Sequence, residues 1–215
     1  MKIRIVIGLL SLLILCSFKQ QNLNDVLKDE CVIYKQNDSV KLLINNGQYR
    51  GTVYTDSIGT IHNLRYMPIT ITNVGTKPIR LQINFANEYN FPIENSSENF
   101  NLFPLPNEWA IEGSEITDSM IDELPNYINK PILDKTLQPG EKILFAIGTK
   151  YIRGKTGGIL PNSIFTLEDK EIFEECDLFK NDVLSSNSPK ELGFKFSVSG
   201  SCFIIPCGNY LFLKE

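Results

Sequence analysis

Few residues of this chain are of a type and spacing that could do chemistry. His62 is the only histidine, and a catalytic histidine needs a nucleophile beside it, for which the chain offers no G-x-S-x-G turn. Cys202 and Cys207 have the spacing C-x4-C, but a zinc site needs a second pair of ligands. The sequence therefore predicts no enzyme activity, no metal site and no cofactor, and we interpret His62 as a loop or strand-end residue.

The cysteines could also form disulfide bonds. Besides Cys16 the chain has four of them, Cys31, Cys176, Cys202 and Cys207. An even number in an exported chain predicts disulfides, and four cysteines allow three pairings. We expect Cys202 to pair with Cys207 because they are close in sequence, which leaves Cys31 for Cys176. Buried thiols that act as small hydrophobic side chains are the alternative.

The N-terminus predicts export. Lys2 and Arg4 precede an apolar run that ends at Cys16, the order found in a secretory signal peptide, and the run is shorter than the roughly 20 residues of a membrane-spanning helix. The stretch 13–16, Leu-Ile-Leu-Cys, resembles the lipobox of bacterial lipoproteins, which implies lipid attachment at Cys16. Leu15 departs from that pattern, which has a small residue before the cysteine. Ordinary secretion and an uncleaved anchor therefore remain alternatives.

The charge of the chain limits its partners. The formal net charge is −4, and no basic cluster exceeds two adjacent Lys or Arg residues. Nucleic acid requires a basic face, and an anionic membrane surface requires a polybasic patch. We therefore expect no nucleic-acid partner and no membrane contact beyond the N-terminal signal or lipid. The predicted localisation is the cell envelope, either as a membrane-anchored lipoprotein or as a periplasmic or secreted protein.

The elements that must position any site are predicted to be β-strands. Residues 69–74 and 79–85 alternate apolar and polar side chains, as in an antiparallel sheet with one buried face. Asn46-Gly47 predicts a hairpin turn, and residues 137–141, Leu-Gln-Pro-Gly-Glu, predict a tight turn between two further strands. Seven to nine short strands of this kind indicate an antiparallel β-sandwich.

Two stretches, 86–131 and 153–190, show no strand pattern and are interpreted as long insertions. In the first, a short helix is expected from Asp118 to Leu124, with Thr117 as its N-cap and Pro125 as its end. In the second, apolar residues from 172 to 179 have helical spacing.

The first insertion also carries the aromatic residues Tyr89, Phe91 and Trp109. Aromatic side chains on loops above a rigid scaffold can form a binding surface, and tryptophan is enriched at binding hot spots. Aromatic side chains that pin an insertion to the core are the alternative. We therefore name Trp109, Tyr89 and Phe91 as a candidate contact surface.

The stretch from Met67 to Tyr151 resembles the immunoglobulin-like sandwich modules of bacterial exported proteins. The resemblance is carried by the strand at 69–75, the strand at 79–85 and the turn at 137–141. A narrower resemblance, through residues 84–93 and Trp109, is to the bacterial intracellular proteinase inhibitor family. These resemblances imply an immunoglobulin-like antiparallel β-sandwich with long loop insertions and one or two short helices.

The predicted organisation is a signal peptide at 1–16, a tether at 17–30 and a single decorated sandwich domain at 31–215. The function expected is non-enzymatic binding or scaffolding in the cell envelope, with an envelope protein as the partner. A protease-inhibitor-like module and an envelope hydrolase with an unrecognised site are the alternatives.

Overall fold

A computed structural model gives the fold of this chain. It describes residues 31–37, 40–92, 98–154, 158–167, 176–179 and 191–212. The chain divides into two compact units, residues 1–32 and residues 33–215, and the description below concerns the second. The predicted signal peptide, the tether and Cys16 lie outside the described residues.

Within the described residues, one sheet, here sheet A, has seven strands in the order β1-β2-β4-β9-β7-β6, with β3 also paired to β4. Its strands are β1 (Cys31–Asn37), β2 (Val40–Asn46), β3 (Arg50–Thr55), β4 (Ile61–Asn73), β6 (Tyr89–Asn90), β7 (Asn99–Leu105) and β9 (Lys142–Ile152). The prediction of a mainly β fold is confirmed, and the longest pairing joins β4 to β9.

Sheet B has six strands within the described residues, in the order β10-β12-β13-β5-β8, with β11 also paired to β13. Its strands are β5 (Ile79–Asn84), β8 (Ile132–Leu137), β10 (Ile159–Thr166), β11 (Asp177–Leu178), β12 (Leu192–Val198) and β13 (Ser201–Phe212). The ladders of this sheet are antiparallel except for the short parallel pair β11–β13.

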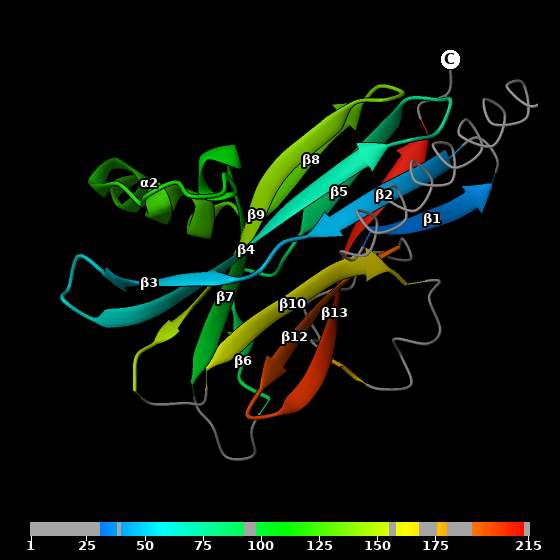
Figure 1. Cartoon of the computed structure of the whole chain (residues 1–215). Coiled ribbons are helices and arrows are strands. Elements are labelled where there is room, and N and C mark those ends of the chain that lie inside the picture. The colour runs from blue at the N-terminus through cyan, green and yellow to red at the C-terminus, as the bar shows by residue number, and fades with distance from the viewer. Residues whose placement is uncertain are drawn as a thin grey trace, which may run out of the picture. The chain divides into compact units, whose positions relative to one another are not determined.

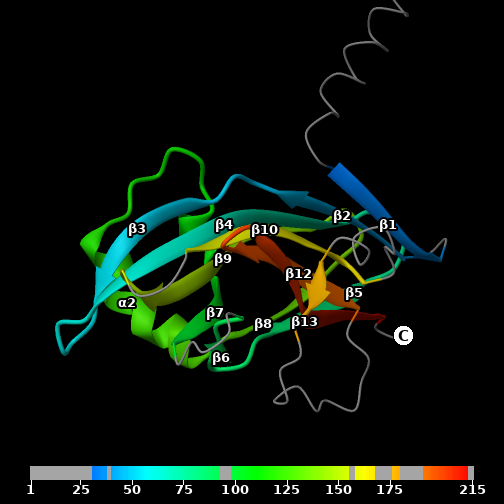
Figure 2. The ribbon, with the colours of Figure 1, turned by 90° about the horizontal axis from the view of Figure 1, so that it is seen from below.

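The two sheets, whose strands are drawn in Figures 1 and 2, share one apolar core. Ile69 of β4 and Phe145 of β9 enter it from sheet A, and Leu81 of β5 and Phe194 of β12 enter it from sheet B. All four side chains are at most 2% exposed. The alternation of buried and exposed residues in β5 follows from this arrangement, because one face of the strand meets the core and the other meets water.

A second apolar cluster lies on the other face of sheet A. It is formed under the 3₁₀ helix η1 (Asn107–Trp109) and the helix α2 (Asp118–Asn129), and it includes Tyr66 of β4 and Phe103 of β7. Because β7 has core on both faces, five of its seven residues are buried. A strand buried on both faces shows no alternation of apolar and polar residues in its sequence. The prediction that 86–131 is an insertion without strands is therefore wrong, because this stretch contains β6 and β7.

Helix α2 begins where the sequence predicts and ends later. Thr117 is the N-cap, and its Oγ1 accepts a hydrogen bond from the N–H of Met120 at 3.3 Å. The helix continues through Pro125 to Asn129, although an interior proline removes one backbone hydrogen bond. Leu124 is fully buried against sheet A, and this packing explains why the helix does not end at the proline.

The predicted hairpin at Asn46-Gly47 is also wrong. Both β2 and β3 pair antiparallel with β4, so the chain runs straight on between them instead of reversing. Gly47 sits opposite Pro68 of β4, and its N–H donates to the Pro68 carbonyl at 2.8 Å. A side chain at position 47 would meet the Pro68 ring at 3.2 Å, so the glycine serves a close approach of two backbones.

The second stretch that lacked a strand pattern contains β10. Pro161 lies in this strand at an irregularity of the β10–β12 register, between Pro161 and Ser163. The helical spacing expected from 172 to 179 falls mostly outside the described residues. In contrast, the turn at 138–141 is confirmed, because Glu141 N–H donates to Gln138 at 2.9 Å and Gly140 has φ 79°. None of the described helices has the length and apolarity needed to cross a bilayer.

Candidate functional site

The aromatic residues proposed as a contact surface are buried. Trp109 is 1% exposed and packs edge-on against Tyr66, with ring centroids 5.3 Å apart. Tyr89 is 1% and Phe91 4% exposed, and both pack against Phe100. These three side chains fix η1 and β6 to the sheet, so the structure offers none of them to a partner.

The disulfide of the described residues joins Cys176 to Cys202, whose Cα atoms are 4.7 Å apart. The expected pair Cys202–Cys207 is wrong, because both residues lie in β13 with four residues of extended strand between them, which separates their Cα atoms by roughly 16 Å. A disulfide needs Cα atoms within about 7 Å. Cys207 is fully buried in the core between the sheets, and the side chain of Cys31 is outside the described part of the chain.

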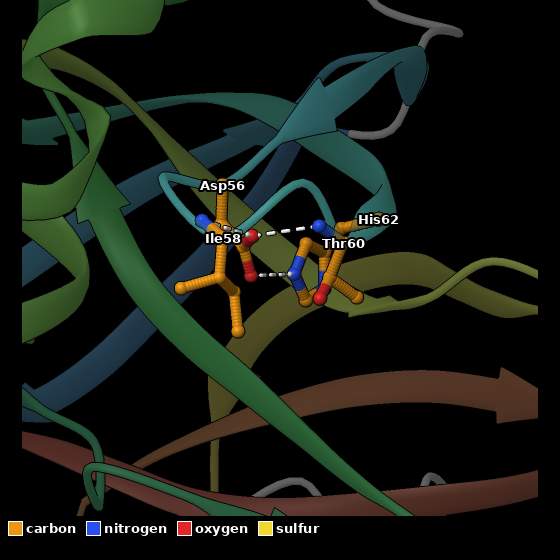
Figure 3. A network of polar contacts seen from close by, with 4 residues as sticks. All are labelled: Asp56, Ile58, Thr60 and His62. Atoms are coloured by element: carbon orange, nitrogen blue, oxygen red, sulfur yellow. Dashed lines mark hydrogen bonds and ion pairs between the residues drawn. The ribbon is translucent and has the colours of Figure 1, made fainter.

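His62 is the second residue of β4, as expected for a strand-end histidine, and it closes the loop that joins β3 to β4 (Figure 3). Its Nε2 lies 2.9 Å from Oδ2 of Asp56. The other oxygen of Asp56 accepts the N–H groups of Ile58 at 3.1 Å and Thr60 at 2.8 Å. The hydrogen bond from His62 and these two N–H groups lower the pKa of Asp56, so the group is a carboxylate at neutral pH.

This histidine–carboxylate pair is not joined to a nucleophile in the described structure. Nδ1 of His62 is buried and has no hydrogen-bond partner among the described residues. A catalytic triad would place a hydroxyl or thiol within hydrogen-bond reach of one ring nitrogen. The visible role of Asp56 is to hold the loop and the ring in place.

A groove of about 570 Å³ lies between β8, the end of β7 and the first half of β9. Its walls are mainly apolar, and Tyr127 of α2 stands at one side. Its lining includes Leu105, Leu133, Lys135, Lys142, Ile143 and Leu144. The size falls within the range of about 300–1,000 Å³ that is usual for ligand pockets.

One wall of the groove is the edge strand β8. The N–H of Phe85 donates to the carbonyl of Pro131 at 3.1 Å. This bond shows which residue pairs of the antiparallel β5–β8 ladder are hydrogen-bonded and which are not. Hydrogen-bonded pairs alternate with non-bonded pairs in an antiparallel ladder. Asp134 and Thr136 therefore turn their backbone N–H and C=O groups away from β5, to the outer edge of sheet B.

The opposite wall is the start of β9. The N–H of Asn73 donates to the carbonyl of Glu141 at 2.9 Å, so Lys142 and Leu144 turn their backbone groups away from β4. On that side β7 pairs with β9 only from Ala146 onward. In the described part of the chain, the outward groups of Lys142 and Leu144 have no backbone partner.

The strands β8 and β9 are joined by the tight turn at 138–141, yet they belong to different sheets and do not pair with each other in the described ladders. Two unpaired strand edges thus border one apolar groove. Lys135 and Lys142 line this groove and are exposed. At the other end of the groove, Pro106 and Tyr127 also line a smaller pocket of about 260 Å³ with Glu108 and Glu123.

Sequence reasoning missed this groove because the strand expected before the turn at 137–141, which is β8, was not placed at the edge of a sheet. Its signal is the pattern Leu133, Lys135, Leu137, in which a lysine stands on an otherwise apolar face. An inward-pointing charge is a known property of edge strands. That pattern could have identified the position of the strand at an edge.

The described structure shows no further chemical centre. Among the described residues, no three His, Cys, Asp or Glu side chains come close enough together to hold a metal ion. The proposed lipid-attachment residue Cys16 lies outside those residues. No family model, no curated protein and no solved structure matches the chain.

Proposed function

We propose that this chain is a non-enzymatic binding protein of the cell envelope that holds an extended segment of another envelope protein in the groove between β8 and β9. The observation that carries the proposal is the pair of unpaired strand edges on the two sides of an apolar groove. An extended peptide can add to such an edge through main-chain hydrogen bonds, while pockets beside the edge select alternate side chains.

The geometry limits the length of the segment. β8 has six residues, of which Asp134 and Thr136 present outward backbone groups. Lys142 and Leu144 present the matching groups on β9. A segment of about six residues would pair with one or both edges, and its alternate side chains would reach the apolar wall that includes Leu133 and Ile143.

Charge complementarity indicates the composition of the segment. The β8–β9 end of the groove carries Lys135, Lys142 and one carboxylate, Glu141, which already accepts the N–H of Gln138 at 2.8 Å, whereas the pocket at the α2 end carries Glu108 and Glu123. We therefore infer a segment of alternating apolar residues with an acidic residue at one end and a basic residue at the other. Opposite charges of this kind fix orientation and register more than they raise affinity.

The experiment is peptide selection followed by hydrogen exchange. A library of random seven-residue peptides is selected on the full chain in mild detergent, and one selected peptide is synthesised. We expect it to alternate apolar residues and to carry the two opposite charges. On binding, it should slow amide hydrogen exchange at Asp134, Thr136, Lys142 and Leu144.

A matched pair of variants tests the edge itself. Thr136→Pro removes an outward N–H, which a proline on an edge strand tolerates because the lost donor faces away from the sheet. Thr136→Ala keeps the N–H. We expect the first variant to lose peptide binding and the second to keep it. Equal binding by the two variants, or exchange protection at other strands only, would contradict the proposal.

Export belongs to the same proposal. The signal-like N-terminus motivates it, and the disulfide between Cys176 and Cys202 supports it because disulfides persist in oxidising compartments. Attachment of lipid at Cys16 is the form of anchoring that we propose. Fractionation of the native host should place the protein in the membrane fraction, and Cys16→Ser should release it from that fraction. Full-length protein in the cytosol would exclude export.

A further inference from the structure

A second, polar pocket lies on the outer face of sheet A, away from the groove. It has a volume of about 220 Å³ and is lined by His62, Glu88, Glu98, Asn99, Asn101, Lys150, Tyr151 and Ile152. Cross-strand pairing builds its floor, because His62 lies opposite Ile152 and Lys150 lies opposite Asn101. Six of the eight lining side chains are polar or charged, in contrast to the apolar groove.

Lys150 supplies a hydrogen-bond donor to this pocket. The side chain is half-buried, and this burial lowers the pKa of the ammonium group, while the nearby Asp56 and Glu88 raise it in part. No hydrogen bond or ion pair of the ammonium group is formed within the described residues. A half-buried cation without an acceptor is costly, so a group that accepts from Lys150 would be stabilised here.

His62 supplies an acceptor. Because Asp56 is a carboxylate, it can only accept, and the hydrogen bond at 2.9 Å places the proton on Nε2 of the histidine. In the neutral ring, Nδ1 then carries a lone pair, and this buried atom has no partner among the described residues. The residue is 6% exposed, so bulk water does not reach the ring freely. This nitrogen has almost no accessible surface, so a ligand that donates a hydrogen bond to it must first displace the side chains that cover the ring.

A hydroxyl group meets both requirements, because it accepts from an ammonium and donates to a ring nitrogen. Glu88 and Glu98 can accept from further hydroxyls, and the amide of Asn99 can donate or accept. The lining carries two carboxylates against one ammonium, so an anionic ligand such as phosphate would be repelled. The pocket is smaller than the roughly 300 Å³ at which drug-sized pockets begin, which suits one ring rather than a longer molecule.

We propose that this pocket binds one neutral, hydroxyl-rich ring, namely a single sugar unit, between Lys150, His62 and the Asn99 side chain. The site is separate from the groove and does not depend on what the groove binds. The sugar could be free, or it could be the terminal unit of an envelope glycan, and both sources present the same hydroxyl chemistry.

The test uses the full chain with methyl glycosides of glucose, galactose, mannose and N-acetylglucosamine, measured by saturation-transfer NMR and calorimetry. At least one of them should bind with a Kd on the order of 1 mM, and inorganic phosphate should not. A glycan array then separates the two sources. Tighter binding to an immobilised glycan than to its free glycoside indicates a terminal unit, and equal binding indicates a free sugar.

Two variants test the named residues against a matched control. Lys150→Met removes the donor at nearly constant length, and Asn99→Ala removes the amide. Each should weaken sugar binding about tenfold or more, since a hydrogen bond to a charged group or buried amide is lost. Lys77→Met, at an exposed turn residue outside both the groove and this pocket, should bind sugar as the native chain does.

Circular dichroism checks that each variant is folded, and Asn99 is partly exposed, so Asn99→Ala remains informative if Lys150→Met does not fold. The proposal is overturned if none of the glycosides binds the native chain. It is also overturned if phosphate binds in their place, or if the folded variants bind the sugar with native affinity.

Discussion

At the scale of single residues, two asparagine side chains take the place of missing backbone partners inside the fold. Asn73 is fully buried, and its amide donates to the carbonyls of Lys77 at 2.8 Å and Leu137 at 3.0 Å, while its oxygen accepts the N–H of Gly75. Asn46 bonds both backbone groups of Ile164 in β10. Such side chains replace missing strand partners, and a buried amide left unbonded would be destabilising.

Trp109 gives a direct test of packing against binding. Because its indole is buried beneath α2, Trp109→Ala should leave a cavity and lower the free energy of unfolding by about 3–5 kcal/mol. Urea denaturation followed by circular dichroism measures this loss. Ile111→Ala, at a side chain that is 46% exposed, is the control and should change stability by less than about 0.5 kcal/mol. A Trp109→Ala chain of native stability would show that the indole is not part of the core.

Asp134 makes stability depend on pH. Its hydrogen bonds from Arg80 and then Gln82 lower the pKa of the carboxyl from 3.8 to about 2. The stabilisation is therefore complete above pH 3.8 and is lost as the pH falls toward 2. Both Arg80 and Asp134 are more than one third exposed, so water screens the pair and its contribution to stability is small.

The corresponding variant is Asp134→Asn. At pH 6 it should be less stable than the native chain by that small amount, and most of the difference should be lost by pH 2, where about half of the native carboxyl groups are protonated. Urea midpoints at pH 6, 4 and 2 measure the trend. A difference that stays constant with pH would mean that the ion pair does not contribute.

At the scale of elements, the sequence predicts strands whose two faces differ. β5 and the second half of β4 were predicted because one face lies in the core and the other does not. β7 was missed because both of its faces are buried and it contains Pro104, and β10 was missed because Pro161 interrupts its pattern. Such strands cannot be recognised by alternation of apolar and polar residues. Their proline residues also argue against a strand when only the sequence is considered.

The candidate site was beyond sequence reasoning for a related reason. The groove exists because β8 and β9 diverge into different sheets after a turn that looks like an ordinary hairpin. Nothing in residues 137–141 distinguishes a turn within one sheet from a turn between two. In the polar pocket, the pairing of β4 with β9 brings together His62 and Lys150, which are 88 positions apart in the sequence. A local sequence motif cannot predict a contact over such a separation.

The disulfide ties Cys176, which directly precedes β11, to Cys202 of β13. Cys176 and Cys202 are 26 residues apart, and closing a loop of that length stabilises the folded state by about 3–4 kcal/mol in the chain-entropy model. The double variant Cys176→Ala/Cys202→Ala should lose that amount in urea denaturation. Mass spectrometry of the native chain without reductant should give one peptide pair containing Cys176 and Cys202, and a pair containing Cys202 and Cys207 would contradict the structure.

At the scale of the whole described unit, the open groove is also a hazard. Unpaired strand edges promote association between chains, and a charge that points inward on an edge strand opposes it. Lys135 has that position on β8. Lys135→Val should therefore raise the fraction of dimers and larger species in light scattering. Lys77→Val, at an exposed turn residue, is the matched control, and equal association by the two variants would mean that Lys135 does not protect this edge.

The position of β13 has a consequence for how the chain acquires its fold. This strand, residues 201–212, lies between β12 and β5 in the middle of sheet B, and β5 comes more than 100 positions earlier in the chain. Contacts of such high sequence separation slow folding, because a long loop must close before any pairing is gained. A nascent chain that has not yet delivered residue 201 would hold β5 with one partner only. That edge of β5 would stay unpaired until synthesis has passed the last pairing residue of β13.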